Sequence, residues 1–332
     1  MNTKQIVLAS RPKGAPQLTD FRFDVTELLK IKTGEVLLKP IYFSVDPYMR
    51  GRMNDLKSYI PPFKIDQPIE SNSLAEVIES KSDNFKPGDI VMGMLPWMED
   101  VVVSVKGLQI IDASQEPISY FLSVLGMIGL TAYVGLKRIC QPVAGETVVV
   151  SGAAGAVGLV VGQIAKLKGC RVIGITGSDE KAKLLVGKYG FDKALNYKNT
   201  TYLSTEISSI CPNGVDIYFD NVGGVISDAV LSNLNFQARI VICGQISLYN
   251  STVIPIGPRL QPILLGKGAM MKGFLVNNYK SEFPEALKYL SKAVNEGKLK
   301  FTETISQGFD QLPKAFLGLF NGENIGKMIV KI

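Results

Sequence analysis

Residues 147–158 constrain the fold of this 332-residue chain more than any other segment. They read T-V-V-V-S-G-A-A-G-A-V-G, an apolar β-run that breaks into glycines and continues with a helical pattern. A glycine-rich strand-to-helix turn lets the backbone approach a pyrophosphate, and the helix points unpaired amides and its positive dipole end at that anion. Side chains at Gly155 and Gly158 would obstruct this approach. The segment therefore predicts a dinucleotide-binding turn, although its first glycine position holds Ala153.

The sequence after this turn alternates between strands and helices. Apolar runs predict strands at residues 147–151, 171–176, 194–197, 215–219, 239–244 and 270–276. Stretches of helical length lie between them, at residues 156–168, 179–189, 201–210, 222–234 and 258–266. Six strands with alternating helices predict an α/β domain with a doubly wound parallel sheet, the Rossmann arrangement.

The end of the second strand indicates which dinucleotide binds. NAD-specific sites place an acidic residue there to bind the ribose hydroxyls, but this chain has Thr176, Gly177 and Ser178. Lys181, one helical turn later, could supply a cation for a 2′-phosphate, with the Ser178 hydroxyl as a second donor. A plain helix start, with Ser178 as N-cap and Lys181 in solvent, is the other interpretation, and both can hold together. The pattern favours NADPH.

Histidine is absent from the chain, and only four cysteines occur. The commonest general base, the imidazole metal ligand and every Ser-His or Cys-His pair are therefore excluded. The cysteines lie too far apart in sequence for a zinc knuckle: Cys140, Cys170, Cys211 and Cys243. Cys243 ends a predicted strand and could approach the cofactor or serve as a small buried residue. These features predict chemistry without a metal.

Composition indicates an ordinary globular enzyme. The net charge of +6 is spread along the chain, and no nucleic-acid motif occurs. Residues 117–136 and 147–165 are uncharged and long enough for membrane spans, but glycines interrupt the first and the second is the cofactor turn. Buried elements explain both better, and no signal peptide is visible. We therefore expect a cytoplasmic protein that binds neither membranes nor nucleic acid.

The N-terminal third lacks the alternation of strands and helices. Short β-runs at residues 5–9, 21–27, 35–45, 75–79, 90–94 and 101–105 predict a partly open β-barrel. The tail adds a long helix at 283–295, a strand at 303–307, a helix at 312–320 and a strand at 327–332. We expect the tail to return to the first domain. The predicted domains are 1–117 with 298–332, and 118–297.

Several motifs carry a resemblance to a known family. They are V-D-P-Y-M-R-G-R-M at 45–53, A-A-G-A-V-G at 153–158, Y-F-D-N-V-G-G at 218–224, C-G-Q-I-S-L-Y-N at 243–250 and N-I-G-K at 324–327. The chain resembles the zinc-independent medium-chain dehydrogenase/reductases, within the leukotriene hydroxydehydrogenase, prostaglandin reductase and 2-alkenal or curcumin reductase group. The resemblance implies a GroES-like β-barrel domain beside the Rossmann domain, usually in a homodimer. It also implies NADPH-dependent reduction of the carbon–carbon double bond of small hydrophobic enones and enals.

The resemblance also assigns site residues by position. It implies that the pyrophosphate lies at Gly155, Ala156, Val157 and Gly158, and the 2′-phosphate at Lys181 and Tyr197. Further cofactor contacts are implied at Asn221, Cys243, Gly244, Gln245, Ile246, Ser247, Tyr249, Phe274, Leu275, Val276 and Asn324. Tyr48 and Tyr249 are similar to the family's substrate-facing phenols.

The two tyrosines suit the implied chemistry. Hydride addition to the β-carbon of an enone generates an enolate, and a neutral phenol can stabilise that charge and supply a proton. Tyr249 follows the fifth predicted strand, at the edge where open α/β sheets bind ligands. It could instead pack on the nicotinamide without assisting the reaction. Tyr48 follows an Asp-Pro turn and could equally anchor the β domain.

Other functions stay open on the sequence alone. The long, partly apolar loop at residues 246–262 suggests a substrate lid that favours hydrophobic enones. A quinone reductase of the same superfamily would share the Rossmann half. A low-turnover NADPH-binding protein would need neither Tyr249 nor Asn324. Alcohol oxidation has the weakest support, because an alkoxide would find no metal or histidine to stabilise it.

Overall fold

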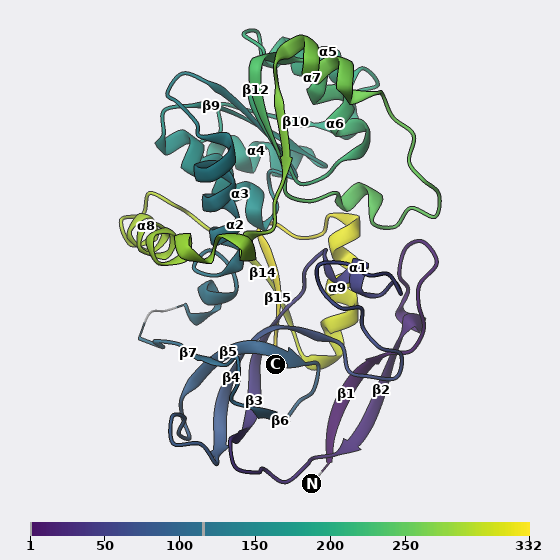
Figure 1. Ribbon diagram of the computed structural model, residues 1–332, viewed down its shortest axis with the longest axis vertical. Coiled ribbons are helices and arrows are strands. Elements are labelled where there is room, and N and C mark those ends of the chain that lie inside the picture. Colours follow the sequence, from purple (N-terminus) through teal and green to yellow (C-terminus); the bar gives the residue numbers. More distant parts are fainter. Residues whose placement is uncertain (1, 115–116) are drawn as a thin grey trace. The chain divides into compact units, whose positions relative to one another are not determined.

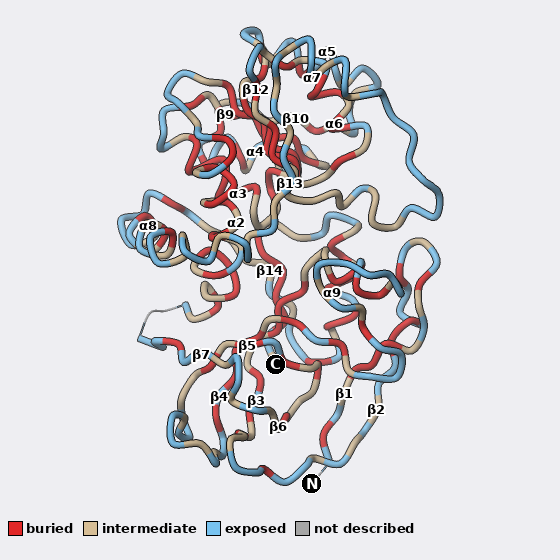
Figure 2. Tube along the Cα trace, viewed as in Figure 1, coloured by how far each residue is buried: buried red, intermediate tan, exposed pale blue. Residues whose placement is uncertain are grey.

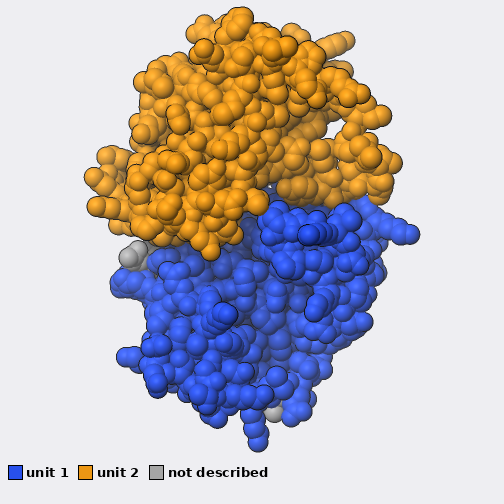
Figure 3. All heavy atoms as spheres, viewed as in Figure 1, with its two compact units in different colours: residues 1–122, 304–324, 328–332 blue, residues 123–303, 325–327 orange. Residues whose placement is uncertain are grey.

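The computed structural model describes residues 2–114 and 117–332. The chain divides into two compact units, coloured blue and orange in Figure 3. Unit 1 contains residues 1–122, 304–324 and 328–332, and unit 2 contains residues 123–303 and 325–327. In the described part of the chain, every helix is too short or too polar to cross a membrane.

Unit 2 is built on a parallel sheet of six strands, in the order β10-β9-β8-β11-β12-β13. The strands are β8 (Thr147–Ser151), β9 (Arg171–Thr176), β10 (Lys193–Asn196), β11 (Val215–Asp220), β12 (Leu234–Ile242) and β13 (Met270–Gly273). From β8 the chain continues outward to β9 and β10, and from β11 it continues outward in the other direction to β12 and β13. Because the strands are parallel, their carboxyl ends meet at one edge of the sheet. The doubly wound parallel sheet predicted from the sequence is confirmed.

Helices connect the consecutive strands of this sheet (Figure 1). They are α3 (Ala156–Leu167), α4 (Asp179–Gly187), α5 (Leu203–Ile210), α6 (Gly224–Leu231) and α7 (Leu260–Lys267). All 5 residues of β8 are buried, as expected for a central strand covered on both faces. Figure 2 shows that burial concentrates in the central strands of the sheet.

Two further helices of unit 2 pack on each other. They are α2 (Met127–Gly135) and α8 (Phe283–Asn295). Their contact is close at Gly129, where an added Cβ would lie 2.8 Å from a methyl carbon of Leu290. The bounds of α8 coincide with the helix predicted from its apolar periodicity.

The sixth strand is shorter than predicted. The sequence predicts a strand over residues 270–276, but β13 ends at Gly273 and a 3₁₀ segment begins at Val276. The pairing explains this difference, because Gly273 lies opposite Ile242, the last residue of β12. Beyond that point β13 has no neighbouring strand to bond. Phe274 and Leu275 therefore connect the strand to the 3₁₀ segment that Val276 begins.

Unit 1 contains a two-stranded sheet and a larger, mostly antiparallel sheet. The small sheet pairs β1 (Asn2–Leu8) with β2 (Phe21–Glu27). The order of the large sheet is β14-β15-β3-β4-β5-β7, with β6 on β3. Its strands are β3 (Glu35–Ser44), β4 (Glu70–Ser80), β5 (Ile90–Pro96), β6 (Val101–Ser104), β7 (Gln109–Ile110), β14 (Glu303–Gln307) and β15 (Lys327–Lys331).

The C-terminal tail contributes a strand and a helix to this unit. β15 pairs antiparallel with β3, where Ile329 lies opposite Ser44. Helix α9 (Leu312–Asn321) adds Phe316 to the buried cluster that contains Phe43 and Trp97. The short helix α1 (Met49–Arg52) adds Met49 to the same cluster, and Met53, directly after the helix, also belongs to it. The separate antiparallel domain agrees with the GroES-like fold expected from the resemblance.

Candidate cofactor and active site

The glycine-rich turn joins β8 to α3. Gly155 is the N-cap of α3 and contributes no capping side chain. A Cβ at Gly158 would lie 2.4 Å from the Gly152 carbonyl oxygen and 2.7 Å from the Ala153 Cα. Gly158 therefore lets the helix pack against its own turn, while the first-turn amides, which have no partner within the helix, face outward from its N-terminus. Such a terminus binds anions.

Residues 325–327 run beside this turn within unit 2. The Gly326 amide donates to the Ala154 carbonyl (2.8 Å), and Gly326 forms a parallel bridge with Gly155. Gly326 has a φ of +67°, and a Cβ there would stand 1.8 Å from the Thr302 carbonyl oxygen. Only glycine fits this position. Asn324 belongs to unit 1 and immediately precedes this segment in the chain.

Helix α4 begins at the end of β9, as both interpretations of this segment require. The Ser178 hydroxyl oxygen caps the helix by accepting from the Lys181 amide (3.3 Å). Asp179 is engaged by the side-chain amides of Asn196 and Asn199, at 3.0 and 2.7 Å. These bonds hold the first carboxylate after β9 in a local network rather than leaving it to face a ligand.

Two residues that follow β10 cover Gly177. At the position of a Gly177 Cβ, the Tyr197 ring would lie 3.3 Å away, and the Cε of Lys198 3.6 Å away. Lys181 lies close enough to Lys198 for their charges to interact. Burial lowers the pKa of Lys181, and the positive charge of Lys198 lowers it further. The structure thus brings Ser178, Tyr197 and Lys198 to Gly177, and Lys181 lies near Lys198.

The position of Lys198 beside Gly177 was not predicted from the sequence. The signal that could have found it is the pairing of the strands, because Asn196 lies opposite Thr176 in parallel register. The residues after β10 must then lie beside the residues after β9. Lys198 is two residues past Asn196, as Ser178 is two past Thr176.

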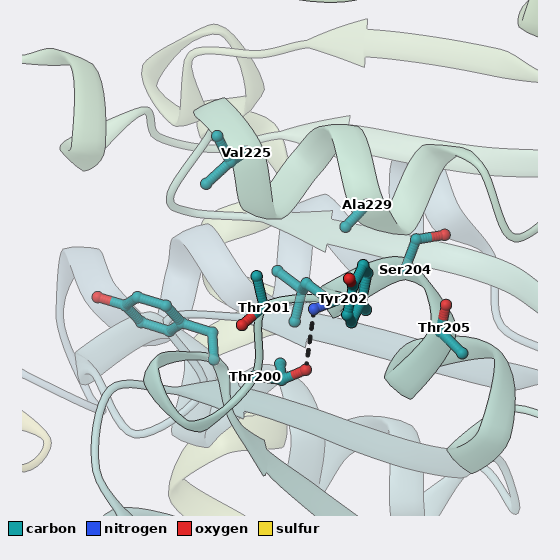
Figure 4. A pocket seen from close by; sticks show the side chains of 9 residues that line it. Thr200, Thr201, Tyr202, Ser204, Thr205, Val225 and Ala229 are labelled. Atoms are coloured by element: carbon teal, nitrogen blue, oxygen red, sulfur yellow. Dashed lines mark hydrogen bonds between the residues drawn. The ribbon is translucent and has the colours of Figure 1, made fainter.

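Tyr197 also lines a cavity of about 400 Å³. Figure 4 shows Val225 and Ala229 projecting from α6 on one side, with Thr200, Thr201 and Tyr202 opposite. Among the described lining residues none is charged. The cavity is therefore lined by hydroxyl and apolar groups rather than by charges.

The carboxyl ends of β11 and β12 bring most of the remaining predicted cofactor residues together. The Asn221 side chain donates to the Ser151 carbonyl (2.7 Å), and the Asn221 carbonyl accepts from the Ile246 amide (3.4 Å). The Ser247 hydroxyl donates to the Val222 carbonyl (2.6 Å). Residues 221–224 and 243–249 therefore form one connected surface at the edge of the sheet where open α/β folds bind ligands.

Tyr249 ends the second of these loops. Its hydroxyl oxygen accepts a hydrogen bond from the Gln245 amide (3.2 Å). Burial raises the pKa of the Tyr249 hydroxyl above its ordinary value, and the Gln245 amide acts in the opposite direction. The phenol is therefore neutral at physiological pH and keeps its proton for donation.

Cys243 lies in the same loop, directly after β12. Burial raises the pKa of its thiol to about 12, so that it stays protonated near neutral pH. This favours the interpretation as a small packed residue. Among the described residues, no three His, Cys, Asp or Glu side chains gather where they could hold a metal ion.

Phe274 and Tyr48 belong to different units of the chain. The Phe274 ring packs near Gly135 and meets the Tyr279 ring at 6.3 Å between centroids. Tyr48 belongs to unit 1, where it precedes α1 and packs on the core that contains Met49. Burial and the Asp46 carboxylate raise the pKa of Tyr48, and the Arg52 guanidinium opposes them. Tyr48 is thus an anchor of the β domain and a neutral phenol together.

Comparison with known proteins identifies the family. The model described as the N-terminal domain of oxidoreductase matches residues 4–111, and the model described as zinc-binding dehydrogenase matches residues 156–292. The Bacillus subtilis (strain 168) protein YfmJ, which carries the name of an NADP-dependent oxidoreductase, is 52% identical over 99% of this chain and 97% of its own length. The chain belongs to the zinc-independent medium-chain dehydrogenase/reductases.

Other members of this family are also similar over their full length. A 2-alkenal reductase (NADP⁺-dependent) of Nicotiana tabacum is 41% identical over 100% of this chain and 98% of its own. The crystal structure of CurA from Vibrio vulnificus in complex with NADPH is 42% identical, with a TM-score of 0.95 over 99% of this chain and 98% of that one. An Escherichia coli quinone oxidoreductase complexed with NADPH has a TM-score of 0.76 at 19% identity, which shows the shared fold alone.

Proposed function

We propose that this chain uses NADPH to reduce the carbon–carbon double bond of α,β-unsaturated aldehydes and ketones. The observation that carries the proposal is the neutral Tyr249 phenol, whose oxygen is fixed by the Gln245 amide at the ligand-binding edge of the sheet. The name of the tobacco 2-alkenal reductase supports the same reaction class, and the CurA complex supports NADPH as the cofactor. The quinone alternative is supported only by the shared fold.

The residues present fit NADPH. The amides of residues 155–158 would hold the pyrophosphate at the start of α3. Lys181, Ser178 and Tyr197 would hold the 2′-phosphate around Gly177, and the nearby Asp179 carboxylate is held by Asn196. The remaining parts of the cofactor would be lined by Asn221, residues 243–249, residues 274–276 and Asn324. When bound, NADPH supplies a hydride.

The protein must then stabilise one negative charge on the substrate oxygen and allow one proton to reach the substrate α-carbon. Hydride addition to the substrate β-carbon moves the π electrons toward the carbonyl oxygen, which becomes an enolate. The Tyr249 hydroxyl would donate a hydrogen bond to that oxygen, and a proton from water, added at the α-carbon, completes the saturated carbonyl. We assign Tyr48 to the substrate-facing wall, in addition to its packing role.

A spectrophotometric assay of NADPH oxidation tests this proposal. We expect turnover with 2-alkenals and hydrophobic enones, with the saturated carbonyl compound as product and one NADPH consumed for each. Formation of an allylic alcohol, or turnover confined to quinones, would contradict the proposed reaction. No oxidation with any of these compounds would favour a binding protein.

We also propose that two copies of the chain associate. β13 is the outer strand of the parallel sheet, so its free edge can pair with the same edge of a second copy. In the segment that leads to this strand, Leu265 of α7 is 85% exposed, and Ile254 and Ile256 of the loop before α7 are 90% and 100% exposed. Apolar exposure of this extent is typical of an interface. The cytoplasmic location stays a prediction from the sequence.

A further inference from the structure

Asp220 is a buried carboxylate that the proposed reaction does not use. It ends β11 and is 1% exposed. One carboxylate oxygen accepts from the Ser151 and Tyr218 hydroxyls and from the amides of Val222 and Gly223, each at 2.9 Å. The other oxygen accepts from the Ser227 hydroxyl and from the Gln245 side chain. A buried charge is stable only with such a complete set of donors.

Gln245 connects this carboxylate to the loop at residues 243–249. Its side-chain nitrogen donates to Asp220 at 3.2 Å. Its side-chain oxygen lies against Gly223, where an added Cβ would stand 2.3 Å away. The backbone of Asp220 accepts from the amides of Cys243 (2.8 Å) and Gly244 (3.1 Å). The start of the loop is therefore tied to the end of β11 through both side chain and backbone.

The backbone amide of Gln245 is the group that holds the Tyr249 hydroxyl oxygen, at 3.2 Å. Because a donor occupies one lone pair of that oxygen, the hydroxyl proton points elsewhere. We propose that Gln245 and Asp220 are positioning residues for Tyr249: Asp220 fixes the Gln245 side chain, and the Gln245 amide then aims the phenol. This inference rests on the proposed role of Tyr249 as donor to the substrate oxygen.

The test compares Gln245→Met with Ser227→Ala in the full-length protein loaded with NADPH. Each substitution removes one donor from the same Asp220 oxygen, but only Gln245→Met removes a tie between Asp220 and the loop that holds Tyr249. We expect Gln245→Met to lower kcat for an enone about tenfold with little change in KM, and Ser227→Ala to stay within about twofold. Amide hydrogen exchange of residues 243–249 should rise in Gln245→Met alone.

The double variant with Tyr249→Phe separates this inference from the proposed function. If Gln245 acts through the phenol, Gln245→Met should have no further effect on kcat once the hydroxyl is gone. Equal effects in both backgrounds, or unchanged hydrogen exchange in Gln245→Met, would overturn the positioning role. A Tyr249→Phe variant with the wild-type kcat would instead overturn the donor role of Tyr249 itself.

Discussion

Tyr249 is the residue on which the proposed chemistry depends most. Replacing it by Phe removes the hydroxyl and keeps the ring, so we expect kcat for enone reduction to fall about tenfold to a thousandfold. NADPH affinity should change little if the phenol acts on the substrate. Tyr289→Phe on α8 is a matched control, because that phenol is also half-buried but lies outside the site. Equal kcat values for the two variants would leave Tyr249 a packing role only.

The dependence of kcat on pH is a second test of the same hydroxyl. Burial raises the pKa of Tyr249 above its ordinary value of 10.0, and the protonated form is the donor. The wild-type kcat should therefore stay level through neutral pH and fall only as the pH rises above about 10. An alkaline limb near pH 8 in wild type that persists in Tyr249→Phe would assign the titration to another group.

The lysines around Gly177 should set the preference for NADPH over NADH. Removing one charge-assisted contact costs about 1.5–3 kcal/mol, or roughly tenfold or more in affinity. We expect Lys181→Met and Lys198→Met each to weaken binding of NADPH and of 2′,5′-ADP by about that factor in calorimetry, with NADH unaffected. Lys193→Met, on β10 and exposed, controls for the change in net charge. Equal weakening of NADPH and NADH would contradict the assignment.

At the scale of elements, the sequence predicts the helices and strands that depend on a local pattern of residues. The helices at 283–295 and 156–168 and the parallel strands follow from periodicity and from the glycine turn, and the structure has them. The strand predicted at 270–276 stops early because its length depends on where its neighbour ends, at Ile242. Lys198 was missed for a related reason, since its place beside Gly177 depends on strand register. The Asp220 bonds join residues from Ser151 to Gln245, and no local pattern contains them.

At the scale of the whole molecule, the open edge of the sheet should be covered by a second copy. We expect light scattering at micromolar concentration to give twice the chain mass of 36.1 kDa. Leu265→Asp places a charge on the exposed face of α7 and should weaken the dimer at least about tenfold, with little cost to the monomer. Leu167→Asp, 45% exposed on α3, is the control. A wild-type protein that stays monomeric would contradict the proposal.

The four cysteines have a consequence for the durability of the enzyme. The proposed substrates are Michael acceptors, which alkylate thiolates and imidazoles. This chain has no histidine, and burial raises the thiol pKa to about 12 for Cys140 and Cys243 and to about 11 for Cys170 and Cys211. Near neutral pH almost none of these thiols is ionised. A protein that turns over reactive enals thus offers them few soft nucleophiles, and is guarded against self-inactivation.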